Sequence, residues 1–137
     1  MIIKENVNST IKSSEAVYKL IKQCLDERQE TEKHKEYLYI VGLDSQNKVL
    51  FVDINSIGTV NKGAVNIREI FRIALIKNAS SIILSHNHPS GGVSPSSADT
   101  DVTKTVKTLG KVMDVPLLDH VIVGEDKYFS FADLGLV

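Results

Sequence analysis

The sequence has a single cysteine. One thiol, Cys24, can form neither an internal disulfide nor a metal site built from several cysteines. The Pro-Cys-x-x-Cys ligands of zinc nucleobase deaminases are also absent, which disfavours that class of enzyme. Cys24 falls on the apolar side of a predicted helix, so we expect it to be a core thiol.

An excess of charge of one sign and a long hydrophobic run are also missing. The 16 Lys and Arg residues nearly balance the 17 Asp and Glu residues, which leaves no overall electrostatic footprint for nucleic acid or an anionic membrane. No stretch approaches the roughly 20 apolar residues that span a bilayer, and residues 1–8 lack the apolar run of a signal peptide. We therefore expect a cytoplasmic protein that does not contact membranes.

The composition is that of an ordinary globular chain. Of the 137 residues, 42% are hydrophobic and 24% are charged. A chain of this length and hydrophobic content can build a core without disulfides. No internal repeat or low-complexity segment interrupts the chain. We expect one domain over residues 1–137, in which residues 1–12 form an N-terminal arm or strand.

Hydrophobic periodicity predicts three helices and several strands. The helices begin near Ser13 or Ser14, after Asn66, and at Ser96 to Asp99, where polar capping residues precede apolar positions at helical spacing. The strands are predicted at 36–43, 48–60, 81–84, 117–123 and 127–131. The first two flank the turn residues 44–47, which indicates a hairpin. This order favours an α/β or α+β fold with a mixed sheet flanked by helices.

Two histidines follow the apolar run 81–84. Side chains alternate along a strand, so His86 and His88 project to the same side and can meet one ion. The carboxyl end of a strand is also where ligands commonly bind in open α/β sheets. Asp99, in the first turn of the third helix, would return to this point if the Gly91-Gly92 loop folds back. His, His and a carboxylate form a standard catalytic zinc set that leaves one position for water.

A zinc-activated water still needs a general base and a group that stabilises the developing oxyanion. Glu36 and Glu69 are the two candidates for the base. Glu69 is explained by a capping box with Asn66, whereas Glu36 begins an apolar strand, where partial burial would raise its pKa into a useful range. We favour Glu36. Ser96 is the candidate for the oxyanion role, although Ser96 and Asp99 also fit a helix cap.

These residues carry a family resemblance. His86, His88, Ser96 and Asp99 match the spacing of the JAMM motif of MPN-domain metallopeptidases, in which an upstream glutamate completes the set. The chain is more closely similar to the RadC family, over about residues 11 to 137. Four segments carry this resemblance: Arg68-Glu-Ile-Phe71, Ile83-Leu-Ser-His-Asn-His-Pro-Ser-Gly91, Leu118-Asp-His-Val-Ile-Val-Gly124 and Tyr128-Phe-Ser-Phe131.

The resemblance implies a cytidine-deaminase-like three-layer α/β/α fold, one Zn²⁺ per chain, and hydrolysis of an amide or isopeptide bond in a peptide or protein substrate. Glu36 matches the position of the motif's glutamate. The loop reads Gly91-Gly-Val-Ser where RadC proteins more often carry an acidic or amide residue followed by proline. We expect no counterpart of the helix-hairpin-helix domain of full-length RadC proteins, so a DNA-repair role is not carried over.

Two other functions stay open. The domain could be a non-enzymatic, metal-stabilised binding module, since a fold does not dictate a function. A role as a DNA-repair accessory protein is supported only by the family name and by a row of lysines on the third predicted helix, Lys104, Lys107 and Lys111. Homo-oligomers also stay open, because no residue decides the oligomeric state. We interpret His120, within an apolar strand, as a core or edge residue outside the site.

Overall fold

The computed structural model describes all 137 residues. A six-stranded mixed sheet has the order β1-β3-β2-β4-β5-β6, in which only β4 and β5 are parallel neighbours. The strands are β1 (Ile2–Glu5), β2 (Tyr37–Leu43), β3 (Val49–Ile57), β4 (Ser81–Asn87), β5 (Leu117–Val123) and β6 (Tyr128–Ser130). The helices are α1 (Ser14–Asp26), α2 (Ile67–Ile76) and α3 (Ser97–Met113), with short 3-10 turns η1 (Glu30–Glu32) and η2 (Ala132–Leu134).

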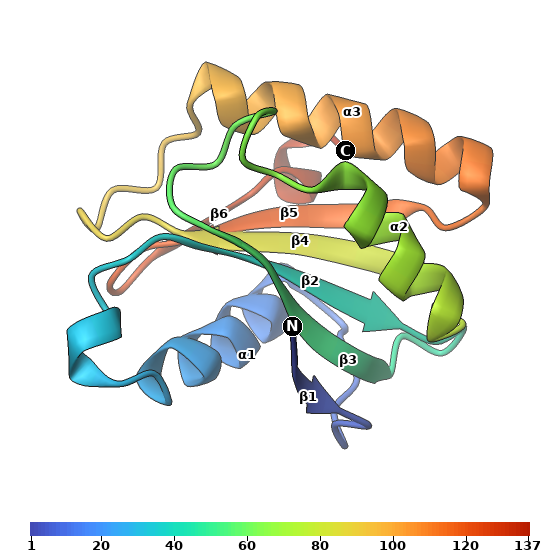
Figure 1. Ribbon diagram of the computed structural model, residues 1–137, viewed down its shortest axis with the longest axis horizontal. Helices are drawn as coiled ribbons and strands as arrows, with labels where there is room; N and C mark the ends of the chain where they lie inside the picture. The colour runs from blue at the N-terminus through green and yellow to red at the C-terminus, as the bar shows by residue number, and fades with distance from the viewer.

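The helices cover the sheet from both sides. Figure 1 shows α1 on one face and α2 with α3 on the other, which gives three layers. The predicted α/β class and three-layer α/β/α fold are therefore confirmed. The N-terminal segment forms a strand, β1, which pairs with β3. No helix has the length and hydrophobicity required to cross a bilayer.

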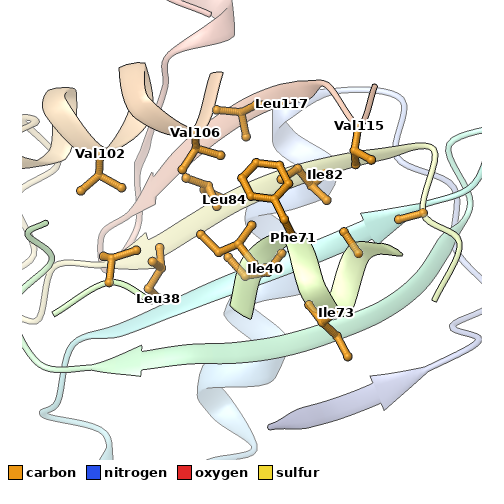
Figure 2. Close-up of a cluster of buried hydrophobic side chains, with 14 of the residues drawn as sticks. Leu38, Ile40, Phe71, Ile73, Ile82, Leu84, Val102, Val106, Val115 and Leu117 are labelled. Carbon is orange, nitrogen blue, oxygen red and sulfur yellow. The ribbon is translucent and has the colours of Figure 1, made fainter. Parts of the chain in front are cut away.

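The central strands are buried on both faces, and alternation divides their side chains between two cores. Leu38 and Ile40 of β2 pack with Ile82 and Leu84 of β4 beneath α2 and α3 (Figure 2). The intervening residues face α1, whose buried positions Val17, Leu20, Ile21 and Cys24 complete the second core. Cys24 is 1% exposed, so the prediction of a core thiol is confirmed.

The third helix is only partly buried along its predicted apolar positions. Val102 and Val106 are fully buried against the sheet, whereas Leu109 and Met113 are exposed toward the helix end. The helix ends at Asp114, which has a left-handed φ of 57°. Asp99, in the first turn of α3, is on the same buried side of the helix as Val102 and Val106.

Candidate metal centre

His86 and His88 lie at the carboxyl end of β4. The strand extends to Asn87, past the predicted end at Leu84, so His86 lies inside the strand and His88 directly after it. His86 shares a sheet face with Leu84 and is completely buried, whereas the His88 side chain keeps 19% exposure. The two Nε2 atoms lie 3.0 Å apart. The predicted convergence of the imidazoles is therefore present, with one ring in the core and the other at the surface.

Asp99 reaches this pair from the first turn of α3. The Asp99 backbone N–H donates to Ser96 Oγ at 3.0 Å, and Asp99 Oδ2 accepts from the Ser96 N–H at 2.9 Å. This complete capping box fixes both the helix start and the carboxylate. Asp99 Oδ1 lies 3.3 Å from His86 Nε2, and Asp99 Oδ2 lies 3.4 Å from His88 Nε2. The structure thus brings together all three residues that the sequence predicted as metal ligands.

The spacing of these three groups suits a metal ion that binds nitrogen and oxygen. Zinc bonds nitrogen and oxygen at about 2.0–2.2 Å, so neighbouring ligand atoms on a tetrahedron lie roughly 3.3–3.6 Å apart. The observed separations of 3.0, 3.3 and 3.4 Å are at or just below that range. His88 Nδ1 is 3.0 Å from the Gly92 carbonyl oxygen and donates to it, so Nε2 is the ring nitrogen that can bind a metal.

Glu36, directly before β2, lies beside the same pair of rings. Leu38 is opposite His86 in the antiparallel β2–β4 ladder, and extending this register by two positions sets Glu36 opposite His88. Glu36 Oε1 lies 3.8 Å from Nε2 of both histidines. The ligand atoms of Glu36, His86 and His88 all lie within 4.8 Å of one another, so this set could also hold a metal ion.

The pKa values of Glu36 and Asp99 shift in opposite directions. Burial raises the pKa of Glu36 above its ordinary value, and this outweighs the opposing effect of the two histidines. Burial also acts to raise the pKa of Asp99, but its contacts with His86 and Ser96 hold the pKa well below the usual range. Asp99 is therefore suited to a permanently ionised role, and Glu36 to one that gains and loses a proton.

The other candidate base is remote from these groups. Glu69 is outside the cluster that contains Glu36, and its carboxylate forms a bidentate pair with Arg72 at 2.6 and 2.7 Å. Hydrogen bonding to Arg72 lowers the pKa of Glu69. Asn66 caps the Glu69 N–H, as predicted, but the Glu69 side chain bonds Arg72 and does not complete the box.

His120 is the residue that our interpretation of the sequence left outside the site. It lies on β5, beside Leu84 in the parallel β4–β5 ladder, and its Nε2 is 2.7 Å from His86 Nδ1. Burial lowers the pKa of His120 well below its ordinary value, so the ring is neutral. The one signal in the sequence was an ionisable pair, Asp119-His120, within an otherwise apolar strand.

A cleft of ≈ 360 Å³ opens beside His88. Its walls come from the end of β4, the glycine loop after it, the β5–β6 turn and the α1 side of the molecule. The lining side chains are mostly polar and carry both signs of charge, with Lys22, Lys33, Asp26 and Glu125 among them. Of the residues at the candidate centre, only His88 lines this cleft.

The fold and these clustered side chains define a three-layer α/β domain with a histidine and carboxylate centre at one end of its sheet. The sequence matches the family described as RadC-like JAB domain over residues 11–136. The chain belongs to the RadC family.

Curated relatives support this assignment. A UPF0758 protein of Chlorobaculum parvum is 38% identical over 97% of this chain, and one of Chlorobaculum tepidum is 41% identical over 96%. A UPF0758 protein of Histophilus somni is 41% identical over 77% of the chain. The chain spans 58%, 57% and 47% of the length of these three relatives.

Proposed function

We propose that this protein is a zinc-dependent hydrolase that cleaves an amide or isopeptide bond in a peptide or protein substrate. One observation carries the proposal: the Nε2 atoms of His86 and His88 lie 3.0 Å apart, each lies within 3.4 Å of one oxygen of the Asp99 carboxylate, and Glu36 Oε1 lies 3.8 Å from both. His86, His88 and Asp99 would hold one Zn²⁺ per chain, and Glu36 would be free for proton transfer.

Bound Zn²⁺ supplies Lewis acidity and lowers the pKa of water toward about 7. Glu36 accepts a proton from the attacking water and returns it to the amine nitrogen as the C–N bond breaks, so that one water yields an acid and an amine. The raised pKa of Glu36 supports this use, because a base with a higher pKa gains the proton more readily.

Ser96 is the proposed donor to the carbonyl oxygen of the substrate. Its Oγ accepts from the Asp99 N–H, so its own hydroxyl proton is not used by the helix cap. Ser96 is exposed at the start of α3, and its backbone N–H holds the Asp99 carboxylate. One residue thus combines a structural cap with a donor for the developing oxyanion.

The first test is the metal content of protein purified without added metal. We expect about one zinc per chain by mass spectrometry, and loss of that zinc in His88→Ala, because His88 is a ligand at the exposed side of the centre. Protein that neither contains zinc nor binds added zinc would overturn the proposal.

The second test asks whether Glu36 acts in proton transfer and not as a metal ligand. Glu36→Gln should keep the zinc and lower the rate of cleavage of fluorogenic peptides and lysine isopeptides by about 10²–10⁴-fold. Glu69→Gln is the matched control and should cleave at the wild-type rate, because Glu69 is paired with Arg72 away from the centre. A zinc-loaded wild-type protein that cleaves none of these probes would favour the metal-stabilised binding module.

A further inference from the structure

A line of buried hydrogen bonds runs from α3 to the candidate ligand His86. The Thr103 hydroxyl lies 2.7 Å from the backbone carbonyl oxygen of Asp99 and 2.6 Å from His120 Nδ1. His120 Nε2 lies 2.7 Å from His86 Nδ1. His86 and His120 are completely buried and Thr103 is 2% exposed. Water is therefore excluded from the whole line.

The direction of each hydrogen bond follows from which atoms carry a proton and which can only accept one. A carbonyl oxygen only accepts, so the single hydroxyl proton of Thr103 goes to the Asp99 carbonyl and its oxygen accepts from His120 Nδ1–H. His120 is completely buried and forms no ion pair with a carboxylate, so its ring stays neutral. With the ring proton on Nδ1, its Nε2 is unprotonated and accepts from His86 Nδ1–H. His86 Nε2 is left as a lone pair that faces His88 and Asp99.

The reverse direction of these hydrogen bonds is disfavoured at the contact between Thr103 and the Asp99 carbonyl. If Thr103 donated to His120 Nδ1, two oxygens would lie 2.7 Å apart with no proton between them, at a separation normal for an O–H···O bond. His120 would then donate to His86, whose own proton would sit on Nε2 and occupy the ligand position. A 180° flip of the His120 ring would keep its stacking on Phe131, at 5.0 Å and 11°, but would replace both ring nitrogens by carbons and lose both hydrogen bonds.

We propose that Thr103 and His120 are positioning residues that fix the tautomer of His86, so that its Nε2 lone pair is presented to the metal before the metal binds. This proposal rests on the proposed zinc site and assigns a role to two residues that do not touch the ion. It also accounts for a buried histidine in β5 that has no part in the proton transfer. In metal sites, partners of this kind typically change metal affinity by about 10–100-fold.

The first experiment observes the proton itself. Ring ¹⁵N shifts of metal-free, histidine-labelled protein distinguish Nδ1–H from Nε2–H, with no contribution from zinc or activity. We expect His86 to carry its proton on Nδ1 in wild type and in Thr103→Ser. Thr103→Val, which keeps the shape but removes the hydroxyl, should populate the Nε2–H form. A wild-type His86 that carries no proton on Nδ1 would overturn the proposal.

The second experiment measures zinc affinity by competition with a chelator. Thr103→Val should bind zinc about 10–100-fold more weakly than Thr103→Ser. Equal affinities for these two variants, with equal ring shifts, would also overturn the proposal while leaving the zinc site intact. Failure of wild type to bind zinc would instead remove the proposed function, and the ring shifts would still decide the tautomer.

A second pair of variants covers the case in which Thr103→Val does not fold. His120→Gln has an amide oxygen that can accept from His86 Nδ1, whereas His120→Leu has none. We expect His120→Gln to bind zinc at least about 10-fold more tightly than His120→Leu. Equal binding by these two folded variants would show that the acceptor at residue 120 has no role.

Discussion

The side-chain amide of Asn87 holds both peptide groups that flank Glu36. Asn87 Oδ1 accepts from the Tyr37 N–H at 2.8 Å, and Asn87 Nδ2 donates to the Lys35 carbonyl at 2.9 Å. Asn87 lies between the two histidines in sequence, but alternation along β4 directs its side chain to the opposite face of the sheet. The strand that supplies the imidazoles therefore also fixes the backbone of the proposed base.

Asn87→Asp should slow turnover and leave zinc binding intact. The carboxylate keeps an acceptor for Tyr37 but faces the Lys35 carbonyl without a donor, so the backbone at Glu36 shifts. Since misplacement by about 1 Å can cost about 10²-fold, we expect a fall in kcat on the order of 10–100-fold with about one zinc per chain. Steady-state kinetics and metal analysis measure the two quantities.

The double variant checks that Asn87 acts through Glu36. In a Glu36→Gln background, Asn87→Asp should cause little further loss, because residues that act as a unit are not additive. An equal loss in both backgrounds would contradict the positioning role.

Gly124 controls the loop that carries Gly92. A Cβ at Gly124 would lie 2.6 Å from the Gly91 carbonyl oxygen and 2.8 Å from Val93 Cγ1, so Gly124→Ala must displace this loop. The Gly92 carbonyl accepts from His88 Nδ1, and its displacement should weaken zinc binding about 10-fold or more. Chelator competition measures the change.

Gly92→Ala is the matched control for Gly124→Ala. A Cβ at Gly92 would meet only Ser90 Oγ, at 4.0 Å, so zinc affinity should stay close to wild type. If both variants weakened binding alike, steric displacement of the loop would not be the cause.

The fold could be predicted from the sequence because its signals are local. Caps at Ser13, Asn66 and Ser96 mark the helix starts, and each of the three side chains accepts a backbone N–H from the first turn of its helix. The strands are apolar runs between turns, a pattern set by burial on both faces of the sheet. The strand end at β4 was placed too early because polar residues normally leave a buried strand, whereas His86 remains inside it.

The remaining parts of the site depend on strand pairing. Sequence alone favoured Glu36 over Glu69 because a helix cap explains Glu69 and because Glu36 begins an apolar strand. The β2–β4 register, extended by two positions, sets Glu36 opposite His88. His120 was missed because its contact with His86 crosses 34 positions of sequence and requires β5 to lie beside β4. A histidine in an apolar strand has no local feature that identifies its partner.

Removal of zinc should lower thermal stability. The proposed ligands join the end of β4 to the first turn of α3, so an ion that binds only the folded chain stabilises it by mass action. At free zinc 100 times above Kd, the gain is about 2.7 kcal/mol, which corresponds to a rise in Tm on the order of 10 °C for a domain of this size. Differential scanning fluorimetry with zinc or EDTA measures it.

His88→Ala supplies the control for this shift. The variant loses a ligand at the exposed side of the centre, so its Tm should be the same with zinc and with EDTA. A zinc-dependent rise in His88→Ala equal to that of wild type would place the stabilising ion elsewhere.

Cys24 should resist thiol reagents until the protein unfolds. The side chain is 1% exposed in the core beneath α1, and burial raises its pKa from 9.0 to about 11. The reactive thiolate is therefore scarce at pH 8, as well as inaccessible. Labelling with a chromogenic disulfide should be slow in native protein and become fast in denaturant.

The same shift predicts how stability depends on pH. Between about pH 9 and pH 11 the thiol ionises in the unfolded chain but stays protonated in the fold, so the unfolded state binds fewer protons. The free energy of unfolding therefore falls as pH rises through this window. Cys24→Ala removes this contribution, and urea unfolding at several pH values should show a shallower fall than in wild type. Identical slopes would mean that the Cys24 thiol ionises as readily in the folded protein as in the unfolded chain.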